Sequence, residues 1–204
     1  MPESVVQVTE GSGKLLHTFQ RVIGANTVED EVILNGEPYL ASYVITAGPV
    51  SAATANSHIL QIMAGASLKV RIRRIEVHQS AVATAAAVML TSLTRLSTAG
   101  TGGTVITPSI MDPAEAASGA TAMTLPTVKG TEGVNVALAA PYMIQTLGAS
   151  TPFANPIVTW DFDRMRTKPP IIAAGVANGF AIKNVTAIAA ATVTVMVWVD
   201  ETNF

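Results

Sequence analysis

The sequence predicts an all-β protein, an antiparallel β-sandwich or jelly roll with an extended N-terminal arm. Short runs of alternating apolar and polar residues recur along most of the chain, separated by clusters of Gly, Pro, Ser and Thr. Strands do not alternate with helical patterns of the kind that builds parallel sheets. Hydrophobic residues make up 49% of the 204 positions, and much of this content is Ala and Val interleaved with Thr, a small and β-prone composition.

The N-terminal arm is expected over residues 1–55. A run over 15–23 predicts one short strand. The stretch 30–46 predicts a hairpin, because Asn35-Gly36 supplies the two positive-φ positions that a type I′ turn requires. The arm is acidic, and its charged residues are Glu3, Glu10, Glu29, Asp30, Glu31 and Glu37 against Lys14 and Arg21.

The second domain is expected over residues 56–204, after a linker at 47–57 that is small, polar and rich in turn formers. Strands at this spacing are typical of a sandwich, a jelly roll or a barrel. The uncharged run 191–199 is an aggregation hazard when exposed, so we expect it in the middle of a sheet or at an oligomer axis. The predicted strands are 58–63, 68–79, 87–97, 103–107, 120–128, 134–147, 156–163, 169–173, 179–184 and 191–199.

The apolar residues of one of these strands change phase half-way along. A strand has a period of two, so it keeps both apolar pairs on the core side only if it contains an extra residue. We therefore predict a β-bulge at Arg73-Arg74. The two apolar pairs are Val70 with Ile72 and Ile75 with Val77.

One helix-like signal occurs, over residues 111–118. Asp112 fits an N-cap, Pro113 fits the first helical position, and Glu115 completes a capping box. The segment is short, so it predicts one or two helical turns within a loop.

Charge is sparse in this chain. Charged residues make up 13% of the sequence, against about 25% in typical soluble domains. A lone monomer of this size needs more surface charge, so we expect the chain to bury surface against copies of itself or within a larger assembly. The alternative is an alanine-rich monomer. A net charge of −2 and an aromatic content of 5% favour neither nucleic acid nor membrane as a partner.

Motifs that indicate enzymes or cofactors are missing or incomplete. Cysteine is absent, which excludes disulfides, thiolate zinc sites and cysteine nucleophiles. The glycine-rich stretch 100–103 precedes a strand pattern instead of a helix, so it predicts a hairpin turn and not a phosphate-binding loop. The stretch 10–16, EGSGKLL, lacks the spacing and the hydroxyl of a P-loop. We expect no cofactor, no metal and no catalysis. None of the three histidines has another histidine or a carboxylate at metal-ligand spacing, and they are His17, His58 and His78.

Two acidic residues, Asp161 and Asp163, lie two positions apart on a predicted strand and therefore share a face. Paired carboxylates bind Ca²⁺ or act as acid and base in some sites. Here they neighbour Arg164 and Arg166, and a solvated or salt-bridged face is the favoured interpretation.

The most concentrated charge in the sequence is basic. Lys69, Arg71 and Arg73 share one strand face, and Arg74 follows them directly. The functional interpretation is a patch that docks onto an acidic partner surface, which includes the acidic arm of this chain or of a neighbour. The alternative is the polar outer face that a half-exposed strand has in any case.

Three stretches resemble virion structural proteins of tailed bacteriophages. They are SHILQIMAGASLKVRIRRIEV (57–77), LTSLTRLSTAGTGGTVITPSIMDP (90–113) and KPPIIAAGVANGFAIKNVTAIAAATVTVMVWVDE (168–201). The similarity is strongest to sandwich or jelly-roll proteins that decorate heads or form fibre knobs. It implies a non-enzymatic head decoration (cement) protein, made in the host cytoplasm and located on the phage head. The implied partners are the major capsid protein or other virion proteins, in a homo-oligomer expected to be a trimer.

The arm suits such an assembly, because an extended segment that adds a strand to a neighbour's sheet gains a row of backbone hydrogen bonds. We expect apolar residues of the arm to make these contacts. They are Leu15, Leu16, Phe19, Val32 and Leu34.

Two other functions stay open. One is a fibre-tip or tail receptor-binding module for host surface glycans, which would use Trp160 with Asp161 and Asp163, or Tyr142. The other is a hydrolase on a jelly-roll scaffold, which only the Asp161 and Asp163 pair supports.

Overall fold

The computed structural model describes residues 18–23, 26–31, 40–81, 88–136, 141–142, 157–164 and 168–202. These residues form fifteen strands and no helix, and every strand pairing among them is antiparallel. The predicted class, an antiparallel β-sandwich, is confirmed. The chain divides into two compact units, residues 1–39 and residues 40–204.

The first unit contains one hairpin, in which β1 (Thr18–Ile23) pairs with β2 (Asn26–Glu31). Thus β1 forms the later part of the strand predicted over 15–23. Phe19 lies on β1. The predicted turn at Asn35-Gly36 and the arm residues Leu15, Leu16, Val32 and Leu34 lie outside the described residues.

The second unit starts earlier than the sequence indicated, because the chain divides after Tyr39 and not near residue 55. The linker predicted over 47–57 is wrong, since β3 (Ala41–Ser51) runs through its first part as a strand of the sandwich. The small residues 47–51 are the last part of β3, and this strand has a bulge at Gly48. Gly48 has a φ of +143°, and a Cβ there would lie 2.7 Å from the Cα of Thr194, so glycine alone fits this crossing.

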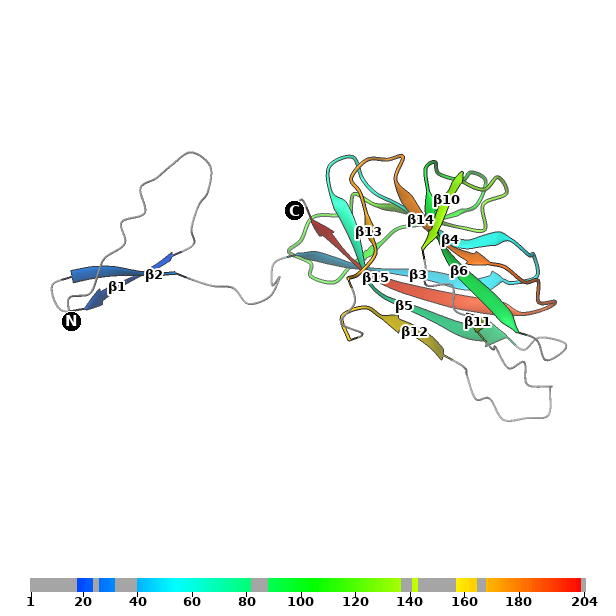
Figure 1. Ribbon diagram of the computed structural model, residues 1–204, viewed down its shortest axis with the longest axis horizontal. Helices are drawn as coiled ribbons and strands as arrows, with labels where there is room; N and C mark the ends of the chain where they lie inside the picture. Colours follow the sequence, from blue (N-terminus) through cyan, green and yellow to red (C-terminus); the bar gives the residue numbers. More distant parts are fainter. Residues whose placement is uncertain are drawn as a thin grey trace. The chain divides into compact units, whose positions relative to one another are not determined.

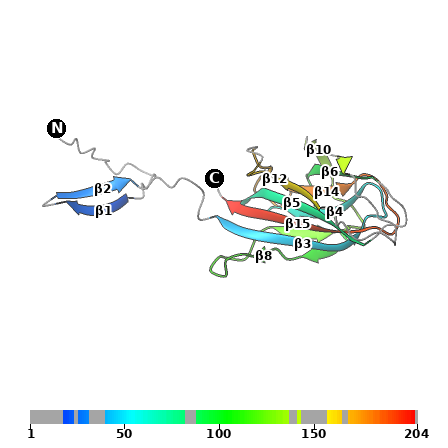
Figure 2. The ribbon, with the colours of Figure 1, turned by 90° about the horizontal axis from the view of Figure 1, so that it is seen from below.

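The second unit has two sheets (Figure 1, Figure 2). The first, called here the β15 sheet, has the order β12-β5-β15-β3-β8, with β13 also paired to β5. Its further strands are β12 (Ile157–Asp161), β5 (Lys69–Ala81), β15 (Thr192–Thr202), β8 (Ser109–Ile110) and β13 (Ile171–Ile172). β15 lies between β5 and β3, as expected for a strand that needs protection.

The second, called here the β4 sheet, has the order β10-β6-β14-β4-β9-β7, with β11 also paired to β6. The strand predicted over 134–147 corresponds to two separate strands, β10 and β11, and β8 of the other sheet was not predicted. The strands of the β4 sheet are β10 (Glu132–Val136), β6 (Met89–Leu96), β14 (Gly179–Asn184), β4 (Ser57–Met63), β9 (Thr121–Thr124), β7 (Thr104–Ile106) and β11 (Pro141–Tyr142).

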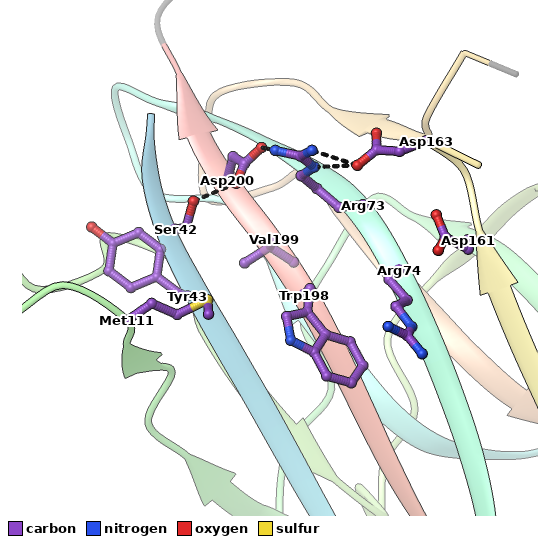
Figure 3. A pocket seen from close by; sticks show the side chains of 10 residues that line it. All are labelled: Ser42, Tyr43, Arg73, Arg74, Met111, Asp161, Asp163, Trp198, Val199 and Asp200. Atoms are coloured by element: carbon purple, nitrogen blue, oxygen red, sulfur yellow. Dashed lines mark hydrogen bonds and ion pairs between the residues drawn. The ribbon is translucent and has the colours of Figure 1, made fainter. Parts of the chain in front are cut away.

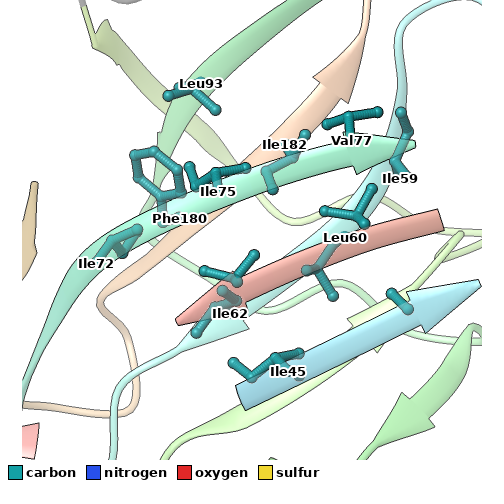
Figure 4. Close-up of a cluster of buried hydrophobic side chains, with 14 of the residues drawn as sticks. Ile45, Ile59, Leu60, Ile62, Ile72, Ile75, Val77, Leu93, Phe180 and Ile182 are labelled. Atoms are coloured by element: carbon teal, nitrogen blue, oxygen red, sulfur yellow. The ribbon is translucent and has the colours of Figure 1, made fainter. Parts of the chain in front are cut away.

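The core lies between these two sheets (Figure 4). Every second residue of β15 from Val193 to Val199 is a valine, and each of the four is at most 1% exposed. They meet apolar residues of the β4 sheet such as Leu60, Phe180 and Ile182, which are equally buried. Each fully buried valine contributes about 1.5–3 kcal/mol, so this strand is a main source of stability.

The predicted bulge is confirmed at Arg73. Trp198 pairs with Arg74 and Val199 pairs with Ile72, which leaves Arg73 as the extra residue of β5. Because of this extra residue, Ile72 and Ile75 are both fully buried although they differ in phase.

Deletion of Arg73 should therefore leave a regular strand with all its apolar residues still facing the core. Thermal unfolding followed by circular dichroism should show a cooperative transition, with Tm lowered only by the lost contacts of Arg73. Deletion of Glu76 in the same strand is the matched control, because it puts Ile75 and Val77 next to each other and turns one of them outward. Equal losses of Tm in the two deletions would contradict the assigned bulge.

Candidate docking face

Each sheet has one face that points away from the core, and on the β4 sheet this face is covered by the chain itself. The segments 97–101 and 126–132 lie over it, joined by a hydrogen bond from Ser97 N–H to Thr131 O at 3.0 Å. As a result, His58 and Gln61 on the outer side of β4 are 0% and 2% exposed.

A chain of polar contacts holds the cover in place. Gly100 N–H donates to Gln61 Oε1 at 2.8 Å, and Gln61 Nε2 donates to His58 Nδ1 at 2.5 Å. His58 Nε2 then donates to Glu132 at 3.0 Å. Lys183 and Lys129 donate to the same carboxylate at 2.7 and 3.0 Å.

The glycine-rich stretch forms a turn in this cover, and no helix follows it among the described residues. The hairpin predicted there is wrong, because β6 before it pairs with β14, and β7 after it pairs with β9. Gly100 is required by close packing, since a Cβ would lie 2.7 Å from Val128 O. Gly102 has a φ of +75°, which glycine adopts without strain.

Two pKa values respond to this arrangement. Burial lowers the pKa of His58 below its ordinary value of 6.5, so the imidazole is neutral at pH 7. Burial alone would raise the pKa of Glu132, but the hydrogen bonds from Lys183, Lys129 and His58 outweigh it and lower the pKa to about 2.

Acid should therefore destabilise the protein in two steps. Both pKa values are lower in the folded than in the unfolded chain, so each contribution is complete above the unfolded pKa and is lost as the pH falls. For His58 the loss begins near pH 6.5, and for Glu132 it runs from pH 4.5 to about 2. Measured Tm against pH should lose the upper step in His58→Gln and keep it in His78→Gln. An unchanged upper step in His58→Gln would refute this assignment.

The outward face of the β15 sheet differs, because its side chains stay partly exposed. Met196 and Trp198 on β15 and Val44 on β3 are half-buried, and Thr46 is exposed. A groove of about 270 Å³ lies in this face (Figure 3). Its lining residues are Ser42, Tyr43, Arg73, Arg74, Met111, Asp161, Asp163, Trp198, Val199 and Asp200. We call the outward face of the β15 sheet, including this groove, the docking face.

The predicted basic patch lies on the docking face, but the chain pairs most of it with its own carboxylates. Asp200, with 2% of its side chain exposed, receives Arg71 Nη2 at 2.7 Å and Arg73 Nη1 at 3.1 Å. Ser42 Oγ donates to the same carboxylate at 2.7 Å. Arg73 also pairs with Asp163 (Figure 3).

The neighbouring arginine, Arg74, stacks on the aromatic ring of Trp198. The Arg74 guanidinium lies over Trp198, 5.0 Å from the ring centroid, and it also pairs with Glu76. A cation–π contact of this kind contributes about 0.5–1 kcal/mol at a solvent-exposed site. The fourth predicted residue, Lys69, lies at the start of β5.

The two predicted acidic residues are engaged, in line with the favoured interpretation of a salt-bridged face. Asp163 pairs with Arg73, and Asp161 Oδ1 accepts the backbone N–H of Arg164 at 3.0 Å. Among the described residues, no group of three or more His, Cys, Asp or Glu side chains is placed to hold a metal ion.

The aromatic platform expected at Trp160 is wrong, because Trp160 points into the core and is 3% exposed. Tyr142 lies on β11, and its side chain is outside the described set. Trp198, which the prediction missed, is a half-buried aromatic residue of the docking face. The strict alternation of valines on β15 was the available signal, since it places Trp198 opposite the core-facing residues.

The helical turns predicted over 111–118 do not form. Asp112 closes one turn, because its Oδ1 accepts Ala114 N–H at 3.0 Å and its carbonyl accepts Glu115 N–H at 3.0 Å. Further along, Glu201 accepts the N–H of Ala120 at 2.9 Å. Without a continuing helix, the segment leaves Met111 58% exposed at the rim of the groove.

Removal of the Asp200 charge should destabilise the fold strongly. Asp200→Asn leaves Arg71 and Arg73 without their buried counter-charge, and we expect a loss of about 2–4 kcal/mol in the free energy of unfolding. Asp163→Asn is the matched control, because this pair is exposed and should contribute at most about 1 kcal/mol. Urea unfolding of both variants measures the difference. Equal losses would show that burial of Asp200 is not decisive.

No family model matches this chain, and neither the curated proteins nor the solved structures compared with it give a match. In the described part of the chain, no helix has the length and apolar character needed to cross a membrane.

Proposed function

We propose that this chain is a non-catalytic structural protein that binds an assembled phage capsid through its docking face, as a head decoration protein. The observation that carries the proposal is the contrast between the two sheets. The outward face of the β4 sheet is covered by the chain, whereas the outward face of the β15 sheet presents partly exposed Trp198, Met111 and Arg74. Trp, Met and Arg are residue types enriched at protein interfaces.

The internal ion pairs support a protein partner. Because Arg71 and Arg73 are paired with Asp200, they hold the shape of the face instead of acting as free charges. The apolar side chain that the docking face exposes most lies toward β8, where Met111 at the rim of the groove is 58% exposed. Contact with a capsid shell would therefore bury apolar surface there, and trimerisation around the particle remains part of this proposal.

The glycan-binding alternative has less support. Its platform at Trp160 is buried, and one face of the Trp198 ring is covered by Arg74. Catalysis by Asp161 and Asp163 is also less favoured, because both carboxylates accept hydrogen bonds from the chain itself.

Shell binding can be tested by co-sedimentation with phage particles that lack this chain. Trp198→Ser combined with Met111→Ser should weaken binding at least tenfold, since both remove interface surface. Val128→Ser combined with Val134→Ser is the matched control, because these valines are 63% and 81% exposed and belong to the cover and to the edge strand β10 of the other sheet. Full binding by the first variant would overturn the docking face, and failure of the wild-type chain to sediment with shells would overturn the proposed function.

A further inference from the structure

The small net charge of the chain hides an uneven division between its two units. The whole sequence has 12 basic and 14 acidic residues. Residues 1–39 hold two of the basic and six of the acidic residues, which leaves ten basic and eight acidic residues in the second unit. The first unit therefore carries a net charge of −4 and the second a net charge of +2, with histidines neutral.

The positive excess of the second unit gathers at one corner of the β15 sheet. The chain leaves β12 and returns to β13 beside the bulge, where Phe162 N–H donates to Arg73 O at 3.0 Å and Ile72 N–H donates to Pro170 O at 3.0 Å. Arg164 and Lys168 lie on the connection between these two anchors, and both are exposed.

Lys69 lies near the same corner, because β13 pairs with β5 at Val70 and Arg71. Within the described part of the chain, none of Lys69, Arg164 and Lys168 forms an ion pair, unlike the arginines of the groove. We call these three residues the basic corner. It lies at the β5 and β12 side of the sheet, opposite the apolar rim at β8.

The first unit has a complementary feature, since its strand β2 ends in three consecutive acidic residues, Glu29, Asp30 and Glu31. In the described structure β2 is paired only with β1. A run of three carboxylates is unfavourable by itself and gains free energy beside cations, most of all at low ionic strength.

We propose that the acidic β1–β2 hairpin of one copy binds the basic corner of a second copy, so that the chain associates with itself by exchange of arms. Charge complementarity between the two units selects this occupant over an uncharged or basic partner. The proposal concerns contacts between copies and does not depend on shell binding, so either inference can fail without the other.

The full chain tests this proposal by sedimentation velocity at low and high salt. The wild-type chain should form oligomers at micromolar concentration that dissociate as salt rises. Glu29→Lys with Glu31→Lys, and separately Arg164→Glu with Lys168→Glu, should each weaken association at least tenfold. An equimolar mixture of the two variants should restore it, because each reversed segment then meets an opposite charge.

A matched control is Asp112→Lys with Glu115→Lys, which changes the charge of the chain as much as the arm variant does but away from the corner. It should associate like the wild type, and the arm and corner variants should keep the wild-type Tm. A monomeric wild-type chain at low salt would overturn the proposal. Unchanged association in the arm variant, or no restoration in the mixture, would also overturn it. A monomer that still sediments with shells would leave the proposed function intact.

Discussion

The central strand β15 contributes side chains both to the core and to the outward face of its sheet. The arrangement of the other strands of the second unit depends on this double role. Its valines face the core, while Trp198 and Asp200 face outward. The strand pairs along most of its length with β5 on one side and β3 on the other. Because no edge of β15 is free, the fold can tolerate an uncharged, strongly β-prone sequence that would aggregate if exposed.

The bulge in β5 makes this arrangement compatible with the basic sequence beside it. Without an extra residue, either Ile72 or Ile75 would face solvent. With it, both are buried, and Arg73 and Arg74 both reach the outward face. Asp200 of β15 then neutralises Arg71 and Arg73, and Trp198 supports Arg74. The groove is thus a product of the bulge and of the central strand together.

The outward faces of the two sheets differ in how their polar and apolar side chains are covered or paired. On the β4 sheet, buried polar groups form a continuous chain from Gly100 through Gln61 and His58 to Glu132, so that each has a partner under the covering segments. On the β15 sheet, charged groups pair at the surface and apolar groups remain accessible. A covered face stabilises the monomer, and a partly open face leaves surface for a partner.

Much of the fold was readable from the sequence because it depends on local periodicity. Alternation located most strands, and the phase change between Ile72 and Ile75 located the bulge, since both follow from the period of two along a single strand. The acidic character of the arm was equally plain from composition.

Tertiary structure alone decided what depends on distant partners. Asp200 meets Arg71 across 129 positions, a pairing that no local pattern contains. Whether Trp160 or Trp198 is buried depends on which face of each strand meets the other sheet. The small residues around Gly48 read as a linker because the strand they pair with is β15, which is more than a hundred residues away in the sequence. Local sequence therefore determined the strands, and contacts between distant strands determined the site.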